Sequence, residues 1–222
     1  MSKKRKSRGK ELEQEQERIS QINEYISDSS YQIKSQCAID VLIAKLRMIN
    51  AELSKKKGRV VVNQITSRIK SAQSIYAKLI RKGLEPDFKT AQKKLNDLVG
   101  VRVVCPFEDE VYEVANLLKA QGDIEVIKEK DYMKHPKKNG YKSLHVILEI
   151  PIYFAEGFQK ERVEVQFRTT AMDYWSVLDY QLFYKKKLDG SSEIAAELKK
   201  YAEDIAKLDA RMLKLRNKIE EM

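Results

Sequence analysis

Glycine is scarce and widely spaced in this chain of 222 residues, and its spacing excludes the common nucleotide-binding loops. The eight glycines lie at least 17 positions apart. A P-loop and a dinucleotide-binding turn both need glycines within about six residues of one another. If a nucleotide binds, side chains rather than a glycine-rich backbone must hold it.

Histidine and cysteine are just as rare, with only His135, His145, Cys37 and Cys105. No pair of them has the spacing of zinc ligands, so a structural zinc site is not expected. A Ser-His-Asp triad would have to use one of the two histidines, and no nucleophile elbow accompanies them. Both cysteines stand among apolar residues and are predicted to be reduced core thiols, as in a cytoplasmic protein.

Long apolar runs are also absent. No segment approaches the roughly 18 apolar residues that a membrane-spanning helix needs, and no apolar region of a signal peptide follows the basic start. We therefore expect a cytoplasmic protein without a membrane partner.

Positive charge is concentrated at one end of the chain. The formal net charge is +10, but the first ten residues hold six Lys and Arg and no acid, which leaves 37 basic against 33 acidic residues elsewhere. Residues 1–10 are predicted to be a basic, disordered tail, and RNA or an acidic partner could bind there. The mildly basic remainder favours anionic ligands in a local patch over a duplex-binding surface.

The hydrophobic pattern divides the rest of the chain into three parts. Residues 11–58 form an N-terminal helical region with a break near Ser27–Ser30, residues 59–188 a mixed domain, and residues 191–222 a C-terminal helix. The domain's expected strands are 59–69, 98–105, 124–132, 142–150 and 161–168, and its expected helices are 71–83, 108–121 and 170–187. The fold class is α/β (α+β), a mixed β-sheet with flanking helices and long terminal helices.

Apolar residues on the last helix follow a heptad spacing. They are Ile194, Leu198, Tyr201, Ile205, Leu208, Met212, Leu215 and Ile219. The stripe could pack against the N-terminal helices or form an interface between copies of the chain. Its narrow width favours a homo-oligomer.

Two carboxylates stand at positions suited to chemistry. Asp97 precedes an apolar strand. On the strand at 161–168, Glu164, Gln166 and Arg168 share one face, which could simply face water. Asp97 and Glu164 together could hold Mg²⁺, which prefers a few carboxylates with phosphate oxygens.

Basic and aromatic residues add two further clusters. Ser71, Ser74, Lys78 and Arg81 fall on one helix face near an N-terminus, which suits phosphates or a solvated surface. In KKNGYKSLHVILEI, residues 137–150, the Tyr141 ring could stack on a purine beside Lys137, Lys138 and Lys142, or be a partly buried sheet aromatic. In combination, the clusters fit a Mg²⁺-dependent transfer between two nucleotides.

Five ordered segments carry a family resemblance: SRIKSAQSIYAKLIRK, NDLVGVRVVCPF, NGYKSLH, VEVQFRT and AMDYWSVLDYQLFYK. They resemble the synthetase domain of RelA/SpoT homologues over about residues 59–188, in the style of a stand-alone small alarmone synthetase. The resemblance implies a nucleotidyltransferase-like fold and transfer of pyrophosphate from ATP to the 3′-hydroxyl of GDP or GTP. The products would be AMP and (p)ppGpp, the stringent-response alarmone, and small members often form homotetramers.

The resemblance also implies a role for each matching residue. Asp97 and Glu164 would bind Mg²⁺, and Glu164 would accept the proton of the attacking hydroxyl. The ATP-binding residues would be Arg68, Lys70, Ser74, Lys78, Arg81 and Arg102, with Arg68 and Arg102 on either side of adenine. The residues binding GDP or GTP would be Tyr141, Lys134, Lys138, Lys142, His145, Gln166 and Asp173. If guanine stacks on Tyr141, the Tyr141→Phe substitution should leave acceptor binding nearly unchanged.

Three positions depart from the family pattern. Lys142 replaces a usual arginine, and Asp179-Tyr180 replaces a usual Glu-His pair, so the choice of acceptor is open. One alternative is a toxin of the same fold that pyrophosphorylates the 3′ end of tRNA. Another is a non-catalytic RNA-binding or scaffold relative, against which the intact Asp97 and Glu164 motifs count.

Overall fold

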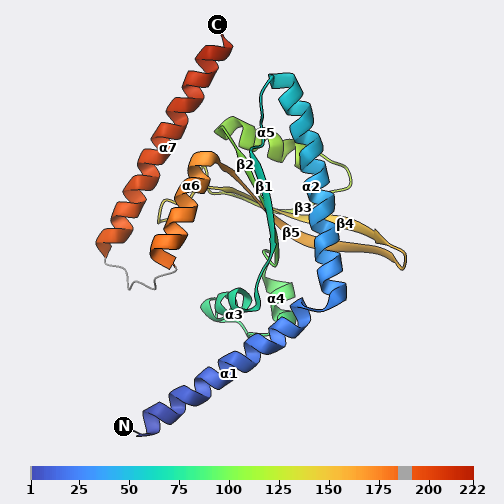
Figure 1. The fold of residues 1–222 in the computed structure, drawn as a ribbon, viewed down its shortest axis with the longest axis vertical. Coiled ribbons are helices and arrows are strands. Elements are labelled where there is room, and N and C mark those ends of the chain that lie inside the picture. The colour runs from blue at the N-terminus through green and yellow to red at the C-terminus, as the bar shows by residue number, and fades with distance from the viewer. Residues whose placement is uncertain (1, 185–191) are drawn as a thin grey trace.

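A five-stranded mixed β-sheet forms the centre of the molecule (Figure 1). The computed structural model describes residues 2–184 and 192–222. The strands follow the order β1-β2-β5-β4-β3 across the sheet. Their bounds are Gln64–Ile69 for β1, Val99–Cys105 for β2, Glu125–Asp131 for β3, Leu144–Phe154 for β4 and Gly157–Thr169 for β5. β2 and β5 pair in parallel and the other three pairs are antiparallel, which confirms the expected mixed sheet with flanking helices.

Strands β4 and β5 are longer than the sequence pattern predicts. They pair without interruption from Leu144 opposite Phe167 to Phe154 opposite Gly157. The resulting hairpin projects beyond the rest of the sheet (Figure 1). At its tip the rings of Tyr153 and Phe158 lie 5.2 Å apart, and this cross-strand aromatic contact extends the pairing past the expected ends.

Two long helices precede the sheet, α1 at Ser2–Ile26 and α2 at Ser29–Lys57. They are separated at the expected break, where the side chain of Asp28 accepts a hydrogen bond from the backbone N–H of Tyr31 and begins α2. Gly58 ends α2 in the left-handed conformation with a φ of 67°, as its position after the last helical residue predicts.

The expected disordered tail is helical over most of its length. Residues 1–10 were predicted to be disordered, whereas α1 begins at Ser2 and projects away from the sheet (Figure 1); Met1 lies outside the described residues. The physical reason is that Lys and Arg are good helix formers, and no proline interrupts this segment.

One face of the sheet carries the main core, covered by α2 and by α5 at Glu108–Lys119. Alternate residues of β5 (Val163, Val165 and Phe167) are fully buried against it. Cys105 is buried in the same core and Cys37 packs at its edge, and both thiols are free. Burial raises the pKa of Cys105 to about 12, so that side chain behaves as an inert core residue.

The segment expected to be one strand at 59–69 is a strand only from Gln64. Val61 and Val62 are buried in the preceding loop, and their backbone N–H groups bond to side chains of α2, at Ser54 Oγ (3.3 Å) and Asn50 Oδ1 (2.8 Å). Because these side chains satisfy the backbone donors, the valines need no neighbouring strand.

A smaller core lies between α1 and two short helices, α3 at Ala72–Arg81 and α4 at Phe88–Lys94. Ser71 begins α3, and Gly83 follows its end with a φ of 64°, both as predicted. The sequence pattern did not predict α4, a helix of seven residues that Asp87 caps by accepting a hydrogen bond from the backbone N–H of Thr90. These two helices lie at the end of the sheet where β1 finishes (Figure 1).

The chain leaves β5 directly into α6 at Thr170–Asp179, followed by the π-helical turn η1 at Tyr180–Tyr184. The helix was expected to reach Lys187, but residues 185–191 lie outside the described residues. The last helix, α7 at Ser192–Glu220, runs beside α6 (Figure 1). Trp175 of α6 donates a hydrogen bond to the Leu198 carbonyl of α7 (3.0 Å), and Thr169 donates one to Asp209 (2.6 Å).

None of the helices that the structure describes combines the length and the apolar character needed to cross a membrane.

Candidate active site

The sheet face opposite the main core carries a row of polar side chains that lie side by side. Strand pairing places Arg102 of β2 next to Gln166 of β5, and Gln166 next to His145 of β4. The neighbouring row joins Arg68 of β1 to Gly100, and Gly100 to Glu164. The alternation on β5 correctly predicted that Glu164, Gln166 and Arg168 share this face, where they line cavities.

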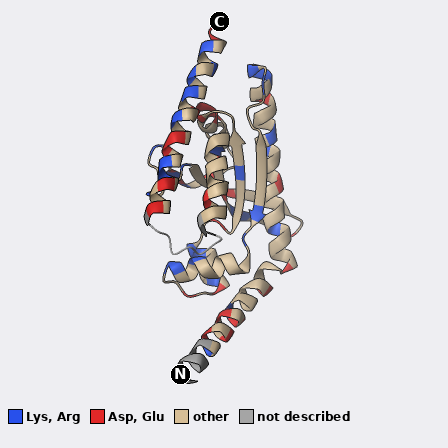
Figure 2. Cartoon of the chain, turned by 60° about the vertical axis from the view of Figure 1, so that its left-hand side comes forward, with Lys and Arg blue, Asp and Glu red and all other residues tan. Residues whose placement is uncertain are grey.

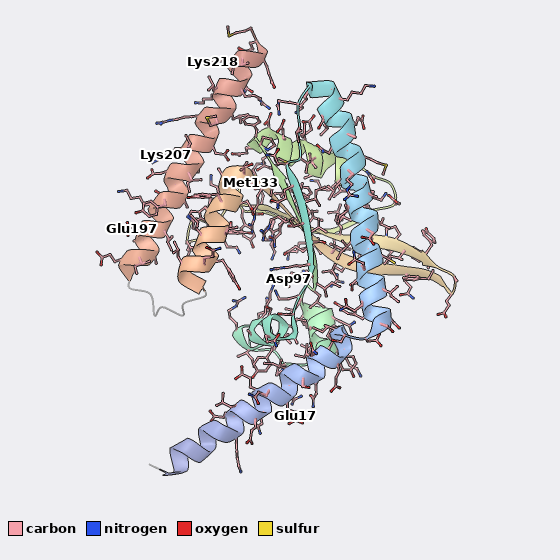
Figure 3. The ribbon with its side chains drawn as sticks, viewed as in Figure 1. Glu17, Asp97, Met133, Glu197, Lys207 and Lys218 are labelled. Carbon is pink, nitrogen blue, oxygen red and sulfur yellow. The ribbon has the colours of Figure 1, made fainter. Side chains whose placement is uncertain are left out.

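Asp97 lies where β1 and β2 meet α3 and α4 (Figure 3). The side chain is mostly buried, and its Oδ2 atom accepts hydrogen bonds from Lys78 Nζ (2.7 Å) and Lys70 Nζ (3.0 Å). Burial alone would raise the pKa of Asp97, but the two ammonium groups outweigh it and the pKa is lowered. Oδ1 is buried without a hydrogen-bond partner among the described residues, so it is an acceptor available for a cation.

Glu164 is the second carboxylate of this face. Its Oε1 atom lies 3.2 Å from His145 Nδ1, and its Oε2 atom accepts a hydrogen bond from Gln166 Nε2 at 2.8 Å. Burial opposes ionisation, but the hydrogen bonds and the charge of His145 outweigh it and lower the pKa of Glu164. The side chain is therefore held as a carboxylate, able to accept a proton.

Tyr141 is joined to Glu164 through His145. The Tyr141 hydroxyl lies 2.8 Å from His145 Nε2 and accepts a hydrogen bond from Arg168 at 2.8 Å. The His145 ring therefore bridges the Glu164 carboxylate and the Tyr141 hydroxyl. Lys137 Nζ lies 4.5 Å from the centre of the Tyr141 ring, and the Arg168 guanidinium 5.2 Å. The ring is thus oriented by its hydroxyl and surrounded by positive charge.

The basic face of α3 opens onto the same space. Ser71 caps the helix by accepting the backbone N–H of Ser74, and its hydroxyl also donates to Ser74 Oγ (3.0 Å). A cavity of about 470 Å³ brings this helix together with both carboxylates and the tyrosine. Its lining includes the predicted residues Arg68, Lys70, Ser74, Lys78, Arg81, Asp97, Tyr141, His145, Glu164 and Gln166.

Arg68 and Arg102 stand on neighbouring strands and line two further cavities. One lies over Gly100 and reaches Asp97 and Glu164. The other, of about 480 Å³, extends along α6 to Asp179 and Tyr180. Both guanidinium groups therefore border a space large enough for a planar base.

Four predicted residues do not line these cavities. Lys134 faces Asp131 (3.8 Å) and the Tyr112 ring, and Lys138 is exposed on the turn. Lys142 lines a small cavity against α7 with Asp209. Asp173 pairs with Arg102 (3.2 Å) and Arg168 (2.9 Å). The structure thus brings Asp173 close to the site and turns Lys142 away from Tyr141, as adjacent extended residues require.

Among the charged and aromatic residues that line these cavities, three have no role predicted from the sequence. Lys130 and Tyr132, at the end of β3, line the cavity of about 470 Å³, and Lys130 pairs with His145 across the strands. Arg168 lines the cavity beside α6. Alternation on β5 had placed Arg168 on this face, whereas nothing in the sequence shows which strand lies beside β4.

The site offers two carboxylates that could take part in holding Mg²⁺. Among the described residues no group of three or more His, Cys, Asp and Glu could hold a metal. The two acids at the cavity, Asp97 with its unpartnered Oδ1 atom and Glu164, suit a cation that completes its shell with water and phosphate oxygens.

Comparisons with known proteins identify the family of this chain. Residues 67–189 match the model of the region found in RelA / SpoT proteins. GTP pyrophosphokinase YwaC of Bacillus subtilis is 37% identical over 183 residues, which cover 82% of this chain and 87% of that protein. GTP pyrophosphokinase YjbM of the same organism is 29% identical and covers 83% of this chain and 86% of that protein.

Solved structures show the same fold. Small alarmone synthetase 2 from Bacillus subtilis has a TM-score of 0.74 at 36% identity, covering 84% of this chain and 97% of that chain. Small alarmone synthetase 1 from the same organism, bound to its product pppGpp, has a TM-score of 0.78 at 26% identity, covering 86% and 99%. The chain therefore belongs to the RelA/SpoT family and, within it, to the small alarmone synthetases.

Proposed function

We propose that this protein transfers pyrophosphate from ATP to the 3′-hydroxyl of GDP or GTP, releasing AMP and making (p)ppGpp. The observation that carries the proposal is the cavity in which Asp97 and Glu164 meet the basic face of α3 and the Tyr141 ring. Two carboxylates, a set of phosphate-binding cations and an aromatic surface are the groups that such a transfer needs.

The donor is expected to lie between the strands and α3. The guanidinium planes of Arg68 and Arg102 border the space for adenine, and arginine planes stack on bases. Lys70, Lys78 and Arg81 then face the phosphates. Bound between Asp97 and Glu164, Mg²⁺ would supply positive charge against the phosphate oxygens. Lys70 and Lys78, which both contact Asp97 here, would turn toward those oxygens.

The acceptor is expected beside Tyr141. Glu164 takes the proton of the 3′-hydroxyl while the hydroxyl oxygen attacks the β-phosphorus of ATP. The bond between that phosphorus and the α–β bridging oxygen breaks. AMP then leaves with the bridging oxygen. His145 and Gln166 keep Glu164 ionised and fix its orientation. The side chains of this protein thus align the two nucleotides and stabilise the developing charge. These two effects account for most of the catalysis of phosphoryl transfer.

The test is a transfer assay with γ-labelled ATP, Mg²⁺ and each of GDP, GTP, GMP and bulk tRNA. Label in a guanosine nucleotide, with an equal amount of AMP, is the expected result, and a chelator should stop the transfer. Label in tRNA alone would overturn the proposal that GDP or GTP is the acceptor. The basic residues of α1 would then be the expected RNA-binding segment. No transfer to any acceptor would overturn the enzymatic proposal.

Tyr141→Ala is expected to weaken acceptor binding by about 1–3 kcal/mol, the range for stacking of one base. The structure changes the expectation for Tyr141→Phe, since the hydroxyl contacts both His145 and Arg168. Phe should keep the stacking surface but lose the orientation of the ring, so its acceptor KM should lie between those of the wild type and the Ala variant. Steady-state kinetics with GDP varied at saturating ATP gives both values. Equal damage by Phe and Ala would show that the hydroxyl, and not stacking, is what matters.

We further propose that the protein is a homo-oligomer through α7, a tetramer by resemblance. The inner side of α7 is buried at Leu198, Ala202 and Asp209. Six of the eight predicted heptad residues are exposed, with exposed fractions from 40% at Ile194 to 62% at Ile219. Figure 2 shows charged residues of both signs along this helix with uncharged residues between them, a pattern typical of helices that pair with helices.

Met212→Glu should reduce the oligomer to smaller species, because a charge would be placed in the apolar stripe of α7. Size-exclusion chromatography with light scattering measures the mass. Met48→Glu is the matched control, since Met48 of α2 is similarly exposed (62% against 49% for Met212) but lies outside the stripe. A wild-type monomer, or equal effects of the two variants, would contradict an interface on α7.

A further inference from the structure

Two arginines from different strands share one carboxylate atom at the edge of the site. Asp173 Oδ1, in the first turn of α6, lies 3.2 Å from Arg102 NH1 and 2.9 Å from Arg168 NH1. Arg102 borders the space proposed for adenine, and its side chain is 32% exposed. Arg168 is nearly buried at 6%. One acid therefore connects a partly exposed arginine with a buried one.

Arg168 extends this connection to the acceptor side. Its NH2 group donates to the Tyr141 hydroxyl (2.8 Å) and to Gln166 Oε1 (3.1 Å). Tyr141 in turn contacts His145, which contacts Glu164. A buried guanidinium is costly unless it is paired, so Arg168 keeps this position only while Asp173 neutralises it.

We propose that Arg168 is a positioning residue for Tyr141 and that, through Asp173, it couples the donor and acceptor sites. The inference rests on the proposed function for the identity of the two nucleotides. When a base stacks on Arg102, the guanidinium gives up part of its pairing with Asp173. The carboxylate is then left to Arg168, which holds Tyr141 more firmly in the orientation that the acceptor base needs.

The charges around Asp173 give the direction of the coupling. Arg102 and Arg168 are like charges that face one acid, and burial together with the neighbouring Arg168 charge lowers the pKa of Arg102. Moving Arg102 toward a base therefore relieves repulsion at Arg168. Donor binding should strengthen acceptor binding, and the acceptor should strengthen donor binding by the same factor, because binding couplings are reciprocal.

The experiment is calorimetric titration of GDP into the wild-type protein with and without a non-hydrolysable ATP analogue and Mg²⁺. The wild type should bind GDP about fivefold or more tightly with the analogue, the lower end of typical couplings. Asp173→Asn should bring this ratio to within about twofold of unity. Arg168→Lys, which keeps the charge but cannot reach three partners at once, should raise the KM for GDP and leave the KM for ATP nearly unchanged.

Asp109→Asn is the matched control, because Asp109 also pairs with an arginine, Arg216 at 2.6 Å, but outside the cavities; its coupling ratio should equal that of the wild type. Should Arg168→Lys fail to fold, Tyr141→Phe removes the same link and should also abolish the coupling. A wild-type ratio of unity, or a ratio unchanged in Asp173→Asn, overturns the proposal. Coupling in a protein without transfer activity would support the link and reject the proposed function, so the two are separable.

Discussion

Glu164→Gln is expected to lower the rate of pyrophosphate transfer by about 10²- to 10⁴-fold, the contribution of a positioned general base. The amide has the size of the carboxylate but cannot take the proton of the 3′-hydroxyl. It also cannot accept hydrogen bonds at both ends from His145 and Gln166, which both contact the carboxylate. Asp97→Asn should have an effect of similar size for a different reason. It removes the negative charge that faces Lys70 and Lys78 and half of the acidic pair proposed for Mg²⁺.

Neither change should unfold the protein, since both side chains border an open cavity outside the main core. The measurements are kcat from the labelled transfer assay, thermal unfolding and the mass in solution. Glu149→Gln is the matched control, because Glu149 lies on β4 next to Lys160 and Arg162 and lines none of the cavities described above. Near wild-type turnover in Glu164→Gln would remove its role as the proton acceptor. In Asp97→Asn the same result would remove the metal-binding role.

Site residues could be predicted from the sequence where strand geometry decides on which face of the sheet a side chain lies. Alternation placed Glu164 and Gln166 on one face, and the apolar run after Asp97 placed that acid at a strand entrance. The structure confirms both positions, since the two carboxylates line a common cavity. Helix ends at Asp28, Gly58 and Ser71 were predictable for a similar reason, because each depends on a single local contact or backbone conformation.

Features that depend on distant parts of the chain could not be predicted. Arg168, which donates a hydrogen bond to the Tyr141 hydroxyl, lies 27 positions further along the chain. Lys142 was assigned to the acceptor, but it faces α7, whose packing no local pattern reveals. The buried loop at Val61 likewise depends on side chains of α2.

Gly140→Ala is expected to be the most damaging change outside the carboxylates. Gly140 has a φ of 90°, and a Cβ atom there would lie 2.5 Å from the Cβ atom of Ala202 on α7. Left-handed backbone costs a non-glycine residue about 1–3 kcal/mol, and overpacking adds about 1–3 kcal/mol. The turn that carries Tyr141 should therefore shift away from α7. We expect the KM for GDP to rise more than tenfold while the KM for ATP changes little.

Ala202→Gly in the same chain separates the two costs, because it removes the clash but leaves the backbone strain. The double variant should recover part of the GDP affinity relative to Gly140→Ala, and Ala202→Gly alone corrects for the roughly 1 kcal/mol that glycine costs within a helix. Gly122→Ala is the control, since a Cβ atom at that position would have no neighbouring atom within 4 Å. Recovery would mean that α7, whose outer stripe is the proposed oligomer interface, also sets the position of the acceptor turn through its inner face. If the double variant were no better than Gly140→Ala, backbone strain alone would explain the loss, and α7 would have no part in placing Tyr141.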